Sequence, residues 1–163
     1  MDYAAFKRVS RVTLGKEPAD LVLKGAKVVD VFTNEMHTAD LAIKDGIIAG
    51  IGTYYEGREE IDMSGKYIMP GFIDSHLHLE STMVTPNELV TIAAGCGTTF
   101  IVDPHEAANV SGTAGVDYIL DQTEDAPANV YVMMPSCVPA TDIDDNGFDF
   151  TAAKMKPYLK NPR

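Results

Sequence analysis

Residues 70–81 read PGFIDSHLHLES, and this stretch decides the predicted fold. A mainly apolar run over residues 68–78 indicates a buried strand that ends in His76 and His78. In an extended strand, residues i and i+2 point the same way, so both imidazoles project from one face and Leu77 from the other. Neutral imidazoles held a few ångströms apart are typical ligands of a divalent transition metal. The stretch therefore predicts a metal-binding strand end, with a pair of polar residues at a sheet edge as the alternative.

Further ionisable groups flank the histidine pair. Asp74 lies two residues before His76, on the same strand face, where its carboxylate is placed to accept a ring N–H. A second cluster, DPHE at residues 103–106, follows the next predicted strand. Pro104 disfavours helical backbone at the residue before it and so helps to end that strand. The two clusters are therefore expected at the ends of neighbouring strands.

The carboxyl ends of strands in α/β barrels are where catalytic groups gather. We therefore predict that His76 and His78 point toward a shared site with Asp103 or His105. The alternative is a loop in which Asp103 or Glu106 only caps a helix.

The other candidate residues carry weaker signals. Residues 135–139, PSCVP, end the third predicted strand, where Ser136 or Cys137 is placed to line a pocket. A stiff loop flanked by prolines is the alternative, and Cys137 has no nearby histidine in the sequence that would indicate a nucleophile. His37 lies in a polar stretch and is interpreted as a solvated loop residue.

From residue 68 onward, strands and helices alternate. Strands are predicted at residues 98–102 and 130–134. Helices are predicted from Thr85, which with Pro86 and Glu88 forms a capping box, and over residues 113–124 and 150–160. Strands that are apolar on both faces and joined by helices imply a parallel sheet covered by helices. This part is either a small open α/β sheet or the first three βα units of a (β/α)8 barrel. A complete barrel needs about 250 residues and does not fit.

The N-terminal part has a different pattern of apolar residues. Residues 3–14 have the apolar spacing of a short amphipathic helix. Short β-like runs punctuated by turns follow, with Asp45-Gly46 as a strong hairpin signal. We therefore expect an N-terminal helix and linker over residues 1–19, a small antiparallel β unit over residues 20–69, and the α/β part over residues 70–163.

Composition excludes several functional classes. The 163 residues include 13 Lys and Arg against 24 Asp and Glu, a formal net charge of −11, so nucleic acid and anionic membranes are disfavoured as partners. The two cysteines lack CxxC spacing, which argues against a disulfide framework or a structural zinc site. The N-terminus has no signal-peptide pattern, and no run has the length of a membrane span. The sequence favours a reducing cytoplasm as the location.

Four stretches together resemble the adenine deaminase family of the amidohydrolase superfamily. They are EPADLV at 17–22, PGFIDSHLHLES at 70–81, DPHEAANV at 103–110 and PSCVPAT at 135–141. The Pro-Gly-Phe-Ile-Asp-x-His-x-His run marks the superfamily broadly. Its combination with Glu80-Ser81 and with the other two later stretches is specific to adenine deaminases. The resemblance covers nearly the whole chain.

The resemblance implies a β-sandwich-like unit beside a (β/α)8 barrel. Three βα units alone leave open sheet edges and uncovered apolar strand faces, so we also expect a homo-oligomer. The resemblance also implies a binuclear manganese or iron centre in which His76 and His78 match the two ligands of the first barrel strand. Hydroxide formed at this centre attacks C6 of adenine and releases ammonia. Residues expected to line the site or to support the ligands are Asp74, Glu80, Ser81, Asp103, His105, Glu106 and Ser136.

The family's remaining ligands and its catalytic aspartate come from later strands, so no catalytic residue is assigned here. We therefore expect the N-terminal segment of an adenine deaminase, truncated before the fourth strand and inactive by itself. One alternative is another amidohydrolase acting on a cyclic amide or a different amine. The other is a non-catalytic, metal-binding or self-associating fragment.

Overall fold

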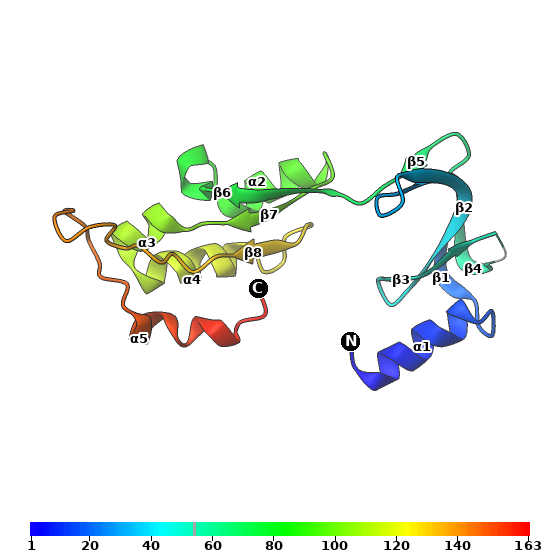
Figure 1. Cartoon of the computed structure of the whole chain (residues 1–163), viewed down its shortest axis with the longest axis horizontal. Coiled ribbons are helices and arrows are strands. Elements are labelled where there is room, and N and C mark those ends of the chain that lie inside the picture. The colour runs from blue at the N-terminus through cyan, green and yellow to red at the C-terminus, as the bar shows by residue number, and fades with distance from the viewer. Residues whose placement is uncertain (54) are drawn as a thin grey trace. The chain divides into compact units, whose positions relative to one another are not determined.

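The chain forms two compact units. The structure, a computed structural model, describes residues 1–53 and 55–163, and the units are Met1–Pro70 and Gly71–Arg163. Figure 1 shows strands dominating the first unit and strands alternating with helices in the second. Among the described residues, no helix is long and apolar enough to cross a membrane.

The first unit is a mixed β-sheet with one helix. Its elements are α1 (Tyr3–Thr13), β1 (Ala19–Asp30), β2 (Glu35–Lys44), β3 (Ile47–Gly52), β4 (Gly57–Asp62) and β5 (Tyr67–Ile68). The strand order is β3-β2-β1-β4, and β5 also pairs with β1. The helix α1 agrees with the sequence prediction, and it packs on the core through Val9 and Val12.

Two predictions for this unit have different outcomes. The hairpin at Asp45-Gly46 is confirmed, because these residues join β2 to β3 with φ angles of 52° and 71°, which suit a two-residue turn. The prediction of a purely antiparallel unit is wrong, since β4 and β5 both run parallel to β1. Alternating apolar residues indicate a strand with one buried face, but they do not indicate the direction of its neighbour.

A partly buried ion pair joins β1 to β2. The Asp40 carboxylate, which is 7% exposed, lies 2.8 Å from the Lys24 ammonium and accepts a hydrogen bond of 2.9 Å from the Gly25 backbone N–H. Burial acts to raise the pKa of Asp40, but the hydrogen bonds from Lys24 and Gly25 outweigh it, and the pKa lies below its ordinary value. The charged carboxylate is therefore the form that the folded unit favours.

Replacing Asp40 with asparagine is expected to lower the free energy of unfolding by about 1–2 kcal/mol at pH 7. Because the folded pKa is depressed, this contribution is present above the unfolded pKa of the carboxyl and disappears as pH falls through the folded value. Urea unfolding of both proteins between pH 3 and 7 measures the difference. The exposed Glu59→Gln variant is the control, and a deficit as large at pH 3 as at pH 7 would contradict the charge argument.

The second unit is a parallel sheet with helical connections. Its strands are β6 (Phe72–Leu77), β7 (Thr98–Val102) and β8 (Val130–Val132), in the order β6-β7-β8. Its helices are η1 (Leu79–Thr82), α2 (Pro86–Ala94), α3 (His105–Ser111), α4 (Thr113–Gln122), α5 (Ala152–Met155) and η2 (Tyr158–Lys160). Parallel pairing of β6 with β7 and of β7 with β8 agrees with the predicted β/α order.

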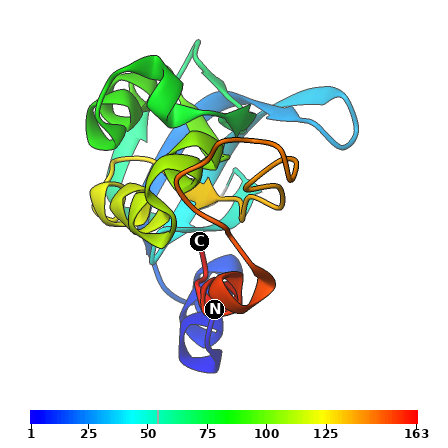
Figure 2. The same cartoon turned by 90° about the vertical axis from the view of Figure 1, so that its left-hand side faces the viewer.

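The core of the second unit lies between the sheet and two of its helices. Val90 of α2 and Ile119 of α4 pack in one buried cluster with Phe100, Val102 and Val130 of the strands. Figure 2, which looks toward the carboxyl ends of the strands, shows α2 and α4 on the same side of the sheet. The register of β6 against β7 shifts between Asp74 and Leu77, where β6 carries one residue more than its neighbour.

Three local predictions need correction. The third strand ends at Val132 and not at residue 134. The helix expected over residues 150–160 consists of the short pieces α5 and η2, because Pro157 lacks a backbone N–H and interrupts the helical hydrogen bonds. Helix α2 begins at Pro86 as predicted, but the Thr85 side chain makes no capping hydrogen bond, so the capping box is not formed.

Helices α3 and α4 approach each other at Gly115. A Cβ atom added at Gly115 would lie 2.2 Å from the backbone oxygen of Ala107. Gly115→Ala is therefore expected to lower the free energy of unfolding by about 1–3 kcal/mol, because backbone atoms must move apart. Gly95→Ala is the matched control, since its nearest neighbour, the Ile92 oxygen, lies at 3.4 Å. Equal unfolding midpoints in urea for the two variants would refute the close-contact explanation.

Candidate metal centre

The two imidazoles of the His-x-His stretch lie side by side. The Nε2 atoms of His76 and His78 are 3.3 Å apart, and the ring centroids are 5.0 Å apart. Leu77 and Leu79 pack in the hydrophobic core of the unit and so anchor this segment to the sheet. The imidazoles point away from this core and are able to bind an ion. This is the placement that the alternation of side chains in a strand predicts.

Asp103 joins the pair from the end of β7. Its Oδ2 atom lies 3.5 Å from His76 Nε2, and its backbone N–H donates a hydrogen bond of 2.9 Å to the Leu77 oxygen. This backbone hydrogen bond aligns the carboxyl ends of β6 and β7. His76, His78 and Asp103 each offer a ligand atom, and these atoms lie within 4.8 Å of one another.

The spacing of these atoms fits a divalent metal. Ligand atoms about 2.1 Å from a tetrahedral ion lie roughly 3.4 Å from one another, which is close to the 3.3 Å and 3.5 Å separations seen here. The Asp103 Oδ1 atom is buried with no hydrogen-bond partner among the described residues. Such an atom costs free energy unless something binds it. The His76 side chain is 60% exposed, so an ion has access from solvent.

Asp74 does not act as predicted. Its Oδ1 atom accepts a hydrogen bond of 3.2 Å from the backbone N–H of His76, and no contact with a ring N–H is described. The carboxylate near the His76 ring belongs to Asp103. The sequence left open which carboxylate lies next to the imidazole, because the partner comes from a neighbouring strand.

His105 faces the cluster from the first residue of α3. Its ring centroid is 6.5 Å from that of His78 in an edge-on arrangement, and its Nδ1 atom is 3.9 Å from the Cys137 Sγ atom. The loop after β8 thus reaches the site through Cys137, whereas Ser136 is exposed and makes no described contact with the cluster. The sequence missed this contact, because residues 105 and 137 are distant along the chain.

Glu80 links the two ligand-bearing segments. Its Oε1 atom accepts hydrogen bonds of 2.8 Å and 3.1 Å from the backbone N–H groups of Glu106 and Ala107. The Glu106 side chain and Ser81 are exposed, and neither is part of the three-residue ligand cluster. Glu106 therefore meets Glu80 through its backbone rather than through its carboxylate. The separate helix α3, which begins here, was not predicted.

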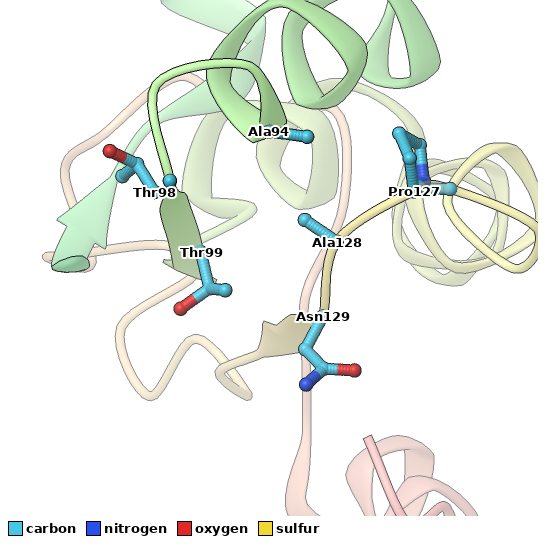
Figure 3. A pocket seen from close by; sticks show the side chains of 8 residues that line it. Ala94, Thr98, Thr99, Pro127, Ala128 and Asn129 are labelled. Carbon is cyan, nitrogen blue, oxygen red and sulfur yellow. The ribbon is translucent and has the colours of Figure 1, made fainter. Parts of the chain in front are cut away.

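A hollow at the opposite end of the sheet lacks reactive groups. It has a volume of about 340 Å³ and lies at the amino-terminal ends of β7 and β8 (Figure 3). Its lining consists of Ala94, Gly97, Thr98, Thr99, Ala126, Pro127, Ala128 and Asn129. None of these residues is an acid, a base or a thiol, so the chemistry is expected at the His-x-His end.

A parallel β/α unit with ionisable side chains gathered at the carboxyl ends of its strands is the arrangement of α/β enzymes with sites at that edge. The sequence pattern of the amidohydrolase family matches residues 67–162, and the chain belongs to this family. An adenine deaminase of Desulfitobacterium hafniense (strain Y51) is 58% identical over 158 residues, which is 96% of this chain and 28% of that protein. Adenine deaminase 2 of Carboxydothermus hydrogenoformans is 49% identical over the same share of each chain.

These relatives confirm the resemblance to adenine deaminases. Among solved structures, a D-aminoacylase studied for its binuclear metal centre is 25% identical, with a TM-score of 0.54 over 72% of this chain and 30% of that one. The chain thus spans about 28% of the length of the adenine deaminases that it matches.

Proposed function

We propose that the chain carries the first metal ligands of an adenine deaminase. This enzyme replaces the C6 amino group of adenine with oxygen, so that adenine and water give hypoxanthine and ammonia. The observation that carries the proposal is the cluster of His76, His78 and Asp103, whose ligand atoms lie within 4.8 Å of one another. The 58% identity to a protein named adenine deaminase supports the choice of substrate.

The three residues of the cluster have distinct roles in this proposal. His76 and His78 hold a divalent metal, manganese or iron in a binuclear centre, through their Nε2 atoms, and Asp103 holds it or accepts a proton beside it. Such a metal supplies an activated water nucleophile at neutral pH. As the C6–O bond forms and the C6–N bond breaks, a carboxylate that accepts the water proton returns it to the leaving amine.

We extend the proposal to the architecture. The parallel sheet β6-β7-β8 corresponds to the first three strands of a (β/α)8 barrel, and residues 20–69 correspond to the β-sandwich-like unit beside it. Asp74, Ser81, His105, Glu106 and Ser136 then line the site or support its ligands. A homo-oligomer and a cytoplasmic location stay predictions.

Amide hydrolysis is a second candidate function. The likeness to a D-aminoacylase favours it, because the same strands there belong to an enzyme with a different substrate. The relatives with 44–58% identity over more than nine-tenths of this chain are nevertheless named adenine deaminases. Assays with both substrates separate the two candidates.

A chimera tests the proposed activity. In it, this chain replaces the matching 158 residues of the Desulfitobacterium hafniense relative, so that the remaining 72% of that protein supplies the later strands. Manganese-loaded chimera is expected to form hypoxanthine from adenine at a rate within about tenfold of the parent. A folded, metal-loaded chimera without this activity, or one that hydrolyses only an N-acyl-D-amino acid, would overturn adenine deamination.

A further inference from the structure

The side chain of Glu80 bridges two segments that are far apart in sequence. Glu80 follows His78 by two residues, in η1, and its Oε1 atom accepts the N–H groups of Glu106 and Ala107, in the first turn of α3. That turn begins two residues after Asp103. The hydrogen bonds of Glu80 therefore join the segment just after His78 to the segment just after Asp103.

The hydrogen bonds of Glu80 serve a helix that has no cap of its own. The residue before α3 is Pro104, which provides no side-chain hydrogen bond to the first turn. The first N–H groups of a helix lack partners within the helix, and a carboxylate is a favourable acceptor for them. Glu80 supplies this acceptor across 26 residues of sequence.

The backbone contact between Asp103 and Leu77 fixes only the strand ends. The direction that the chain takes after each strand depends on η1 and on the start of α3, and Glu80 joins these two. Its second oxygen, Oε2, is buried with no hydrogen-bond partner among the described residues. Because the Oε1 atom carries both described hydrogen bonds of the carboxylate, the link between η1 and α3 depends on this one oxygen.

We propose that Glu80 is a positioning residue, which sets the distance between the imidazole pair and Asp103 and thereby tunes metal affinity. This inference rests on the proposed metal centre. Groups that orient metal ligands without touching the metal commonly change its affinity about 10- to 100-fold when they are removed. Glu80 acts on two ligand-bearing segments at once, although it contacts neither imidazole.

The test compares Co²⁺ binding by the purified chain with that of Glu80→Ala and Glu80→Gln. Visible absorption of the bound ion gives the dissociation constant at a temperature where every protein is folded. Glu80→Ala is expected to weaken binding about 10- to 100-fold. Glu80→Gln keeps an acceptor oxygen and is expected to restore part of the loss. The exposed Glu124→Gln is the control and should bind as the parent chain does.

Amide hydrogen exchange in the metal-free proteins provides an independent readout. The N–H groups of Glu106 and Ala107 are expected to exchange faster in Glu80→Ala, because they lose their acceptor. If both Glu80 variants bind Co²⁺ as tightly as the parent while their unfolding midpoints fall, Glu80 only stabilises the fold and the inference is wrong. If the parent itself binds no Co²⁺, the metal centre and the inference both fail. Should Glu80→Ala not fold, the nearly isosteric Glu80→Gln decides.

Discussion

Replacing either His76 or His78 with alanine is expected to weaken divalent-metal binding by about 100-fold or more. Structural zinc sites with four ligands bind with about 10–16 kcal/mol, so one ligand there contributes roughly 3 kcal/mol, and the scale taken for this site is about 100-fold in the dissociation constant. The 3.3 Å separation of the Nε2 atoms means that one ion can contact both rings. Titration with Mn²⁺ or Co²⁺, followed by calorimetry or spectroscopy, measures the loss.

His37→Ala is the matched control for this experiment. His37 is exposed, belongs to the first unit and pairs with Glu35 at 3.3 Å, so its removal deletes an imidazole without altering the cluster. It is expected to leave the dissociation constant unchanged. Equal losses in His37→Ala and His76→Ala would mean that the measured ion binds elsewhere.

Asp103→Asn is expected to lower kcat/KM for adenine by about 10²–10⁴-fold in the chimera with the Desulfitobacterium hafniense relative. The amide has nearly the same shape as the carboxylate but cannot accept a proton from water at neutral pH, and it is a weaker metal ligand. The Asp103 carboxylate lies 3.5 Å from His76 Nε2, with its other oxygen buried and unpartnered among the described residues. Steady-state hypoxanthine formation at saturating manganese measures the change.

The exposed residue Asp125, in the loop between α4 and β8, provides the control. Asp125→Asn makes the same chemical change outside the cluster and is expected to retain the activity of the chimera. If Asp103→Asn also retains it, Asp103 neither holds the metal nor moves a proton. The proposed role would then pass to a carboxylate of the later strands.

Local sequence patterns predicted most of the elements. The i, i+2 spacing of His76 and His78 placed both imidazoles on one side, and the Asp45-Gly46 turn and helix α4 were expected from turn chemistry and from apolar periodicity. These features depend on residues that are close together in the sequence, so local periodicity and turn residues are enough to predict them. The resemblance to adenine deaminases added the family, which no local pattern supplies.

Several contacts between distant segments were not predicted. The sequence placed both Asp74 and Asp103 near the imidazole pair. Asp103 lies beside the His76 ring, whereas Asp74 accepts a hydrogen bond from the His76 backbone N–H, because strand register decides which carboxylate reaches the ring. The contact of Cys137 with His105 and the cap that Glu80 provides for α3 each join residues more than 20 positions apart. The parallel pairing of β4 with β1 likewise results from the path of the chain across the sheet.

β6 carries one extra residue between Asp74 and Leu77. A hybrid enzyme that exchanges this segment must therefore keep its number of residues. Because side chains alternate between the two faces, losing one residue here would turn His76 and His78 toward the core and send Leu79, which is 2% exposed, toward solvent. A substitution within residues 70–81 changes the contacts of one side chain. A change in length instead moves every following side chain of the strand to the opposite face of the sheet. Crossover points for hybrid enzymes therefore belong outside this stretch, and segments exchanged across it must keep its residue count.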